Sequence, residues 1–259
     1  WTNAEGEVSR GYREDGYFPE AFVNLLAMLG WNPGDDRELF TMDELIQAFS
    51  LERVIKSGAR FNADKAKWYN KEYLRTKSVE ELTELFIPVL EQHGMQVVEC
   101  PKCAITAGSE MTVQGADFKN HIFTVKYVQD VVGLIKERAS FVADFWDIAS
   151  YLFVAPETYV EKDAAKFWKE ENYTLALQVA EFIENFDGGN ATGPEFTKEQ
   201  IEGPLEEFIR SHEWPMGKVM NCLRLALVGA SSGLGIADIV SLIGRKELAS
   251  RIEHIKATL

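Results

Sequence analysis

Two cysteines form the motif in this sequence that most resembles a metal site. Cys100 and Cys103 are separated by two residues, as in half of a zinc site, and His93 and His121 are the nearest imidazoles. Together these four side chains could supply a tetrahedral set of ligands. Their overall spacing is not one of the usual zinc patterns, and paired cysteines at a turn are commonly inert. We therefore expect no bound metal, with Cys100 and Cys103 as the candidates if one is present.

A glycine-rich stretch at residues 227–237, LVGASSGLGIA, is similar to the phosphate-binding loop of dinucleotide-binding enzymes. That loop must follow a strand, open a helix and belong to a parallel sheet. The segment before it begins at Pro215 and has the pattern of a helix, and only one helical stretch remains after Gly235. We therefore expect a connection between two helices, whose glycines allow close approach by another molecule.

The remaining polar residues do not form a recognisable active site. The four histidines are scattered, and none stands in a nucleophile or metal motif. Neighbouring carboxylates such as Asp35 with Asp36 and Glu206 with Glu207 are typical of helix caps or solvated faces. The sequence therefore predicts no catalytic residue.

Positive charge is concentrated between residues 52 and 77, which hold eight cations against three acids. Aromatic residues alternate with the cations, and such a stretch suits contact with a phosphate backbone. The alternative is an amphipathic helix with a solvated basic face, and composition alone does not decide between the two. The cations are Arg53, Lys56, Arg60, Lys65, Lys67, Lys71, Arg75 and Lys77.

The composition is that of a globular protein. The 259 residues are 46% hydrophobic and 26% charged, with a net charge of −14. This charge argues against non-specific binding to nucleic acid or anionic membranes, although a local basic stripe is compatible with it. Three cysteines do not make a disulfide framework in a chain of this length, and no apolar run is long enough to cross a membrane. We expect a cytoplasmic protein with no membrane contact.

Apolar periodicity and capping signals predict an all-α fold. The exception is a small irregular or hairpin insert near residues 95–124, where turn clusters separate short β-branched runs. We expect three helical domains, at residues 1–77, 78–155 with the insert, and 156–259. The predicted helical segments are 19–30, 41–49, 78–94, 125–153, 164–186, 197–209, 215–228 and 236–255, with an interruption at Gly244 in the last.

Several linked motifs resemble bacterial glutamyl-tRNA synthetase, a class I aminoacyl-tRNA synthetase. The resemblance covers most of the chain, apart from residues 98–122, which look like extra material. The motifs are GYREDGYFPEAF (11–22), LGWNPG (29–34), FSLERV (49–54), KSGARFN (56–62), KWYN (67–70), LRLAL (223–227) and IGR (243–245).

The resemblance implies a fragment of a longer enzyme. The family's His-x-Gly-His and Lys-Met-Ser-Lys type motifs do not occur in this sequence, and the chain opens at Trp1 without an initiator Met. We therefore expect a helical stem-contact domain followed by two helical anticodon-binding domains, with no activity alone and no cofactor of its own. The full-length ligase would use ATP and magnesium to join glutamate to tRNA(Glu), and we expect it to be a monomer.

Site residues follow from the resemblance by position. Arg138 falls where discriminating enzymes of the family test the third anticodon base. Arg224 and the loop residues Gly233, Leu234 and Ile236 fall at the family's other anticodon contacts, although some relatives have Thr-Pro in place of Gly233-Leu234. The tRNA stem contacts would be Lys56, Arg60, Lys65 and Lys67.

Two other interpretations stay open. The anticodon region of class I lysyl-tRNA synthetase also resembles this helical pattern, although residues 52–70 favour the glutamyl family. A helical protein-interaction module without an RNA surface would show no salt-dependent affinity for tRNA. Glutaminyl enzymes fit less well, because their anticodon domains are β-barrels.

Overall fold

A computed structural model describes residues 11–56, 58, 60–99, 115–186 and 196–259. The chain forms two compact units. The first unit comprises Trp1–Val89 with Val132–Ile148, and the second comprises Leu90–Val131 with Ala149–Leu259. No helix within the described ranges has the length and apolarity that a membrane span requires. The division into three domains stays a prediction.

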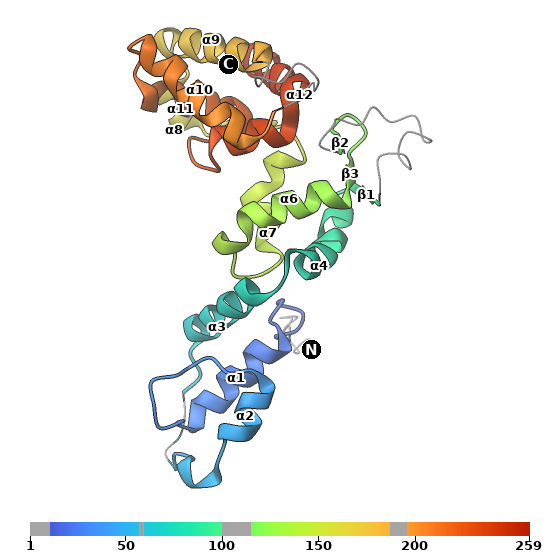
Figure 1. Cartoon of the computed structure of the whole chain (residues 1–259), viewed down its shortest axis with the longest axis vertical. Coiled ribbons are helices and arrows are strands. Elements are labelled where there is room, and N and C mark those ends of the chain that lie inside the picture. The colour runs from blue at the N-terminus through green and yellow to red at the C-terminus, as the bar shows by residue number, and fades with distance from the viewer. Residues whose placement is uncertain (1–10, 57, 59, 100–114, 187–195) are drawn as a thin grey trace, which may run out of the picture. The chain divides into compact units, whose positions relative to one another are not determined.

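The first unit is helical (Figure 1). In chain order its elements are α1 (Pro19–Gly30), α2 (Met42–Ala48), the 3-10 turn η1 (Leu51–Arg53), α3 (Ala63–Thr76), most of α4 (Val79–Gln92), the end of α6 (Val125–Ile135), η2 (Lys136–Arg138) and α7 (Asp144–Ala149).

Capping side chains set where these helices begin. Thr41 and Glu44 form a reciprocal capping box at the start of α2, and Ser78 and Glu81 form another at the start of α4. At the start of α3 the Asn62 side chain accepts a hydrogen bond of 3.1 Å from the backbone N–H of Lys65. These boxes were visible in the sequence, and the predicted helix starts at residues 41 and 78 are confirmed.

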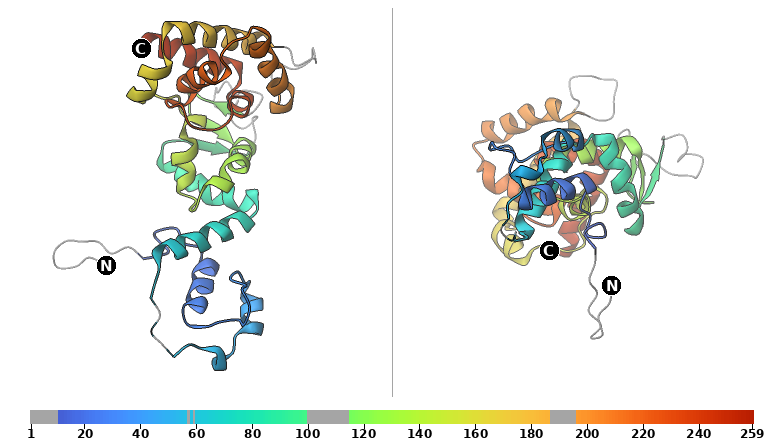
Figure 2. Two further views of the ribbon diagram at one scale, coloured as in Figure 1. Left: turned by 90° about the vertical axis from the view of Figure 1, so that its left-hand side faces the viewer. Right: turned by 90° about the horizontal axis from the view of Figure 1, so that it is seen from below.

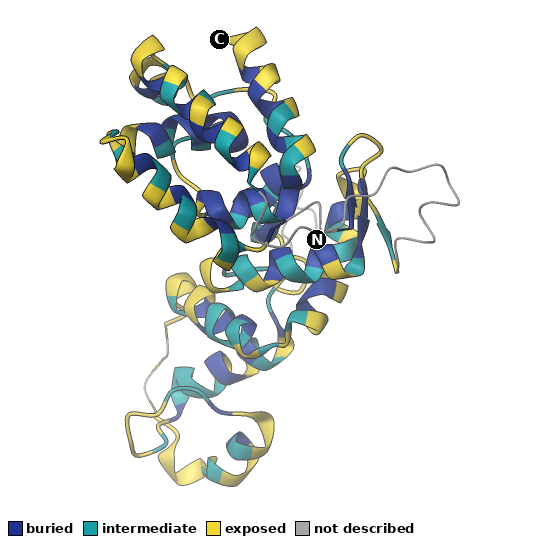
Figure 3. Cartoon of the chain, turned by 45° about the horizontal axis from the view of Figure 1, so that its top comes forward, coloured by how far each residue is buried: buried dark blue, intermediate teal, exposed yellow. Residues whose placement is uncertain are grey.

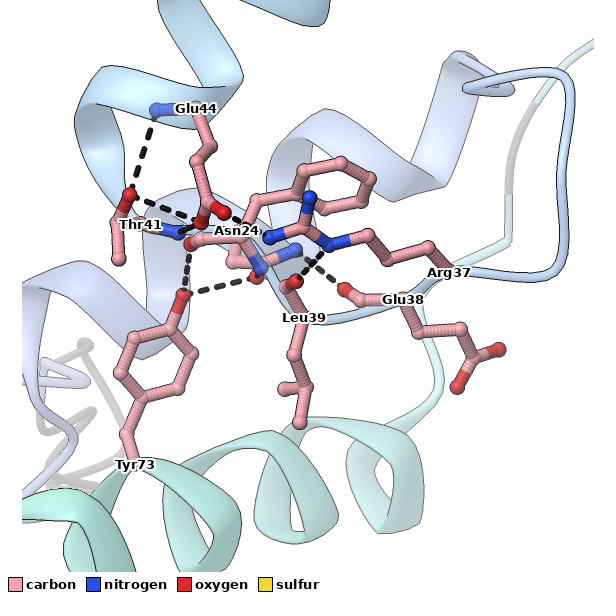
Figure 4. A network of polar contacts seen from close by, with 8 residues as sticks. Asn24, Arg37, Glu38, Leu39, Thr41, Glu44 and Tyr73 are labelled. Atoms are coloured by element: carbon pink, nitrogen blue, oxygen red, sulfur yellow. Dashed lines mark hydrogen bonds and ion pairs between the residues drawn. The ribbon is translucent and has the colours of Figure 1, made fainter.

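A buried polar network joins α1, α3 and the segment before α2 (Figure 4). Asn24 is fully buried, and its Oδ1 accepts from the backbone N–H of Phe40 at 2.7 Å and lies 2.8 Å from the Tyr73 hydroxyl. Its Nδ2 donates to the Glu38 carbonyl at 2.9 Å. Beside this network, Trp31, Phe40 and Leu45 make an apolar cluster. Because both polar atoms of the Asn24 side chain are hydrogen-bonded, the buried amide leaves no unpaired group, and it holds the segment before α2 in place.

The predicted insert contains a small sheet in the second unit, with strand order β1-β3-β2. The antiparallel pair β2 (Ala116–Asp117) and β3 (Ile122–Thr124) is the expected hairpin. The strand β1 (Gln96–Val98) pairs in parallel with β3, which the sequence did not predict. Phe123 packs against Tyr127 and Phe153, so the sheet is anchored by aromatic contacts. Cys100 and Cys103 lie outside the described residues.

Helices α8 to α12 cluster together in the second unit (Figure 2). Their buried positions lie on the sides that face one another, and exposed positions lie outside (Figure 3). The predicted helix over 164–186 divides at Trp168, and the predicted interruption at Gly244 is confirmed by its φ of 75°. The elements that complete this unit are η3 (Ser150–Leu152), α8 (Glu161–Phe167), α9 (Glu170–Asn185), α10 (Lys198–Ser211), α11 (Met216–Val228) and α12 (Ile236–Thr258).

Candidate nucleic-acid interface

The basic segment does not form a single amphipathic helix. Its first part holds the 3-10 turn η1, the described residues between η1 and Asn62 belong to no helix, and its second part is helical, as α3. Of the predicted stem contacts, Lys56 and Arg60 are exposed before α3 and Lys67 is exposed on α3. These three side chains are therefore accessible to a phosphate backbone.

Lys65 is already engaged within the first unit. Its ammonium pairs with the Glu38 carboxylate and lies 4.5 Å from the centre of the Trp68 ring. The pair is partly exposed, so a phosphate can compete with Glu38 for the ammonium at modest cost. Lys65 is thus placed beside the exposed cations, but its contact with RNA would require an exchange of partners.

Three other cations of the segment have structural partners. Arg53 donates to the carbonyl of Pro33, and Lys77 pairs with Glu20 at 2.7 Å. Arg75 pairs with both Glu72 and Glu137 at 2.9 Å. Much of the positive charge of this segment is therefore paired with groups inside the first unit.

Arg138 lies at the end of η2 in the same unit as the basic segment, and its side chain is exposed. The short segment that carries it is fastened to the end of α3. Lys136 donates from Nζ to the carbonyls of Arg75 and Lys77, each at 3.2 Å. Arg138 thus stands on a constrained backbone.

Arg224 and the glycine-rich loop lie together in the second unit. The loop connects α11 to α12, so the predicted helix-to-helix connection is confirmed. Arg224 is half-buried, and its Nε donates to the Leu234 carbonyl at 3.2 Å. Its Nη1 donates to Asn221 Oδ1 at 2.9 Å and to the Ser231 carbonyl at 3.4 Å. Burial lowers the pKa of Arg224, which still stays charged at neutral pH.

The loop backbone is braced by two residues that sequence reasoning missed. Leu234 donates its N–H to the Tyr151 hydroxyl oxygen at 3.1 Å, and Ser231 donates its N–H to Asp163 Oδ2 at 2.8 Å. The second contact lowers the pKa of Asp163, because the backbone donor favours the carboxylate. Tyr151 and Asp163 are 83 and 68 positions away from their partners, so no spacing signal could have revealed them.

Side-chain exposure along the loop is uneven. Gly233 is exposed, whereas Leu234 and Ile236 are only 2% and 1% exposed. Leu234 and Ile236 therefore support the loop from the core, and direct contact with a base falls to its exposed residues. At the start of the loop, Gly229 has a φ of 83°, and a Cβ there would lie 2.7 Å from the Thr158 carbonyl oxygen. Only glycine fits that position without a shift.

The described residues offer no alternative chemical centre. Within the described ranges, no group of three or more His, Cys, Asp or Glu side chains could hold a metal ion. Cys222 is buried, and burial raises the pKa of its thiol to about 12. Such a thiol is an inert part of the core. The arrangement that remains is a set of cations and a braced loop suited to binding.

Two family models match this chain, one over its N-terminal residues and one over most of the remainder. A family model described as an anticodon binding domain matches residues 81–256. A second model, described as the catalytic domain of class I tRNA synthetases (E and Q), matches residues 5–68. The first match covers more than half of the chain and includes Arg138, Arg224 and the loop.

Individual relatives give the same result along nearly the whole chain. The glutamate–tRNA ligase of Parabacteroides distasonis is 43% identical over 96% of this chain and 43% of its own length. That of Flavobacterium johnsoniae is 42% identical over the full chain and 45% of its own length. A crystal structure of a glutamate tRNA ligase from Elizabethkingia meningosepticum in complex with its amino acid has 35% identity and a TM-score of 0.74, covering 99% of this chain and 45% of that one. The chain thus spans less than half the length of the relatives it matches, and it belongs to the anticodon binding domain family found in class I tRNA synthetases.

Proposed function

We propose that this chain is the tRNA-binding and anticodon-recognition portion of a glutamate–tRNA ligase. The observation that carries the proposal is the braced loop with Arg224 inside the region matched by the anticodon model. Similarity to glutamate–tRNA ligases along nearly the whole chain supports the choice of tRNA. The substrates of the full-length enzyme would be glutamate, ATP and tRNA(Glu).

Contact with the tRNA stem would come from the exposed cations of the first unit. Lys56, Arg60 and Lys67 can each neutralise a phosphate, and Lys65 can join them by leaving Glu38. Such contacts position the RNA and carry no sequence information. Because the chain has a net charge of −14, they act at short range, with little long-range attraction to offset the loss of contacts made elsewhere in the enzyme.

Anticodon recognition would use two kinds of donor. The Arg138 guanidinium can hydrogen-bond or stack on an unpaired base, and it would test the third anticodon position. The loop would meet splayed bases through its exposed residues at Gly233 and Gly235, with Leu234 and Ile236 buried beneath them and Arg224 holding the carbonyls of Leu234 and Ser231 in place. In this proposal Arg138 distinguishes the identity of the third base, whereas the loop selects the conformation of the splayed anticodon.

The chemical step would belong to the rest of the enzyme. Class I tRNA synthetases use ATP, and we expect magnesium with it in the full-length ligase. Within the described residues no side-chain cluster suits a metal ion, so we derive no step through magnesium here. We further propose a cytoplasmic monomer.

Binding to defined tRNAs tests the proposal. The chain is titrated, at two salt concentrations, with unmodified tRNA(Glu) and with the same tRNA carrying a changed third anticodon base. Tighter, salt-sensitive binding to the native anticodon is expected. Preference for a lysine anticodon would instead indicate the lysyl family, and salt-independent or absent binding by both this chain and the full-length enzyme would indicate a protein-interaction module.

A further inference from the structure

The segment that carries Arg138 is fastened to the C-terminal end of α3. The Lys136 ammonium lies 3.2 Å from the Arg75 and Lys77 carbonyl oxygens, which are among the last acceptors of that helix. Those carbonyls have no partner inside a helix and carry partial negative charge. A cation that bonds two of them at once both satisfies the helix end and fixes its own backbone.

Further contacts hold the residues that follow. Asn70 is fully buried on α3, and its Nδ2 donates to the Ser140 carbonyl at 2.7 Å. On the other side, Asp144 Oδ2 accepts from the backbone N–H groups of Ser140 and Phe141 at 2.8 and 2.9 Å. The backbone around Arg138 is therefore held by α3 and by the start of α7.

An exposed arginine gains base selectivity only if its backbone is held still. A side chain that tests a hydrogen-bonding edge must be placed within about 0.5 Å of the productive geometry, and neighbouring contacts supply that precision. Arg138 is exposed, whereas Lys136 is half-buried against α3 two residues earlier. The restraints from α3 nearest to the Arg138 backbone are thus the two Lys136 contacts and the ion pair between Arg75 and Glu137, which is more exposed.

We propose that Lys136 is a positioning residue for anticodon selectivity, acting by holding Arg138 against the end of α3. This inference rests on the proposed function, because it needs Arg138 to contact the third anticodon base. In this arrangement α3 supports both the proposed stem contact of Lys67 and the proposed anticodon contact of Arg138. Lys67 lies on this helix eight residues before Arg75, or about 12 Å along its axis.

The first test compares Lys136→Met with Arg138→Ala, using the 259-residue chain and the two tRNAs described above. Lys136→Met keeps the apolar stem and removes the donor. The preference for the native anticodon should fall about three- to tenfold, in the direction of Arg138→Ala, while affinity for the changed anticodon stays within about twofold. Lys136→Arg should restore the preference, because a guanidinium can donate to both carbonyls.

A matched control separates positioning from loss of charge. Lys126→Met removes an exposed lysine whose partner is Asp130, four residues away on α6. It loses the same charge as Lys136→Met, so it should leave the preference unchanged. An equal weakening of both tRNAs by Lys136→Met would assign the residue a general role and overturn the proposal.

A second measurement needs no RNA. Hydrogen exchange at the amides of residues 137–141 should be faster in Lys136→Met than in the wild type, and unchanged by Lys126→Met. Unchanged exchange there would overturn the proposal even if binding changed. If the wild-type chain and the full-length ligase both show no anticodon preference, the proposed function itself fails. If preference is lost in Arg138→Ala but kept in Lys136→Met, only the positioning inference fails.

Discussion

The backbone N–H of Leu234 donates to the phenolic oxygen of Tyr151 across 83 residues of sequence, at 3.1 Å. The Leu234 carbonyl accepts from Arg224 Nε, so both backbone polar groups of this residue are paired by side chains from other elements. A loop held in this way keeps one shape in the absence of RNA.

Removing the Tyr151 hydroxyl should therefore loosen the loop. Tyr151→Phe leaves a buried N–H without its acceptor, and we expect a loss of about 1–3 kcal/mol in the free energy of unfolding, together with a weaker preference for the native anticodon. Urea denaturation and tRNA titration measure the two effects. Tyr12→Phe, at a side chain 44% exposed, is the control and should change neither. An intact anticodon preference in Tyr151→Phe would show that the loop does not depend on this contact.

A methyl group at Gly229 should be poorly tolerated. Its φ of 83° and the 2.7 Å approach to the Thr158 carbonyl predict that Gly229→Ala loses about 1–3 kcal/mol of stability. Gly217→Ala, at the start of the α11 helix that Gly229 follows, is a matched control, since nothing lies within 4 Å of the added Cβ. There we expect no loss, or a gain of about 0.4–1 kcal/mol. Equal destabilisation by both changes would contradict the argument.

The stem and anticodon contacts should have different signatures. Lys67→Ala should weaken binding to both tRNAs by the same factor and reduce the slope of log K against log salt by about one. Arg138→Ala should instead cost about 1–3 kcal/mol of base discrimination. Salt titrations with both tRNAs measure both quantities. An unchanged preference in Arg138→Ala, also in the full-length enzyme, would refute its assignment.

Glu44 should contribute to stability in a pH-dependent way. Arg37 and the capping contacts from Thr41 lower the pKa of its carboxyl to about 2. The unfolded chain then binds this proton more readily than the folded chain does, so the contribution is present above about pH 4.5 and is lost as pH falls towards 2. The stability difference between wild type and Glu44→Gln, measured in urea at pH 5.5, 4.5 and 3.5, should shrink as the pH falls. A difference that stays constant would mean that the ionised form is not specifically stabilised.

Cys222 should resist thiol reagents while the chain is folded. Because burial raises the pKa of its thiol to about 12, little thiolate is present at neutral pH and the reagent has no access. In a variant with Cys100→Ser and Cys103→Ser, we expect no reaction in buffer and one thiol per chain in denaturant. Rapid labelling of the folded variant would contradict the buried position.

Local signals predicted most helix ends correctly. The boxes at Thr41 and Ser78 and the break at Gly244 each depend on residues within four positions of one another, so the sequence carries them directly. The parallel pairing of β1 with β3 joins Gln96 to Ile122 and has no such local signature.

The candidate interface was only partly predictable for the same reason. The cations of residues 52–77 were evident, but their division between exposed residues such as Lys67 and paired ones such as Arg75 depends on distant acids. The supports of the loop, Tyr151 and Asp163, come from other elements of the fold. Residue types identify the cations in the sequence, whereas tertiary packing determines which of those cations remain accessible.

The burial of Leu234 and Ile236 has a consequence for redesign of this surface. Their side chains belong to the core, so changing them to alter codon choice would damage the fold before it changed the readout. Ser232, Gly233 and Gly235 are the exposed members of the loop, and a Cβ at Gly235 would lie 2.8 Å from Asp238 Oδ2. A library meant to retarget the loop towards another anticodon should therefore vary Ser232 first, since Gly233 has a φ of 156° that constrains what can replace it.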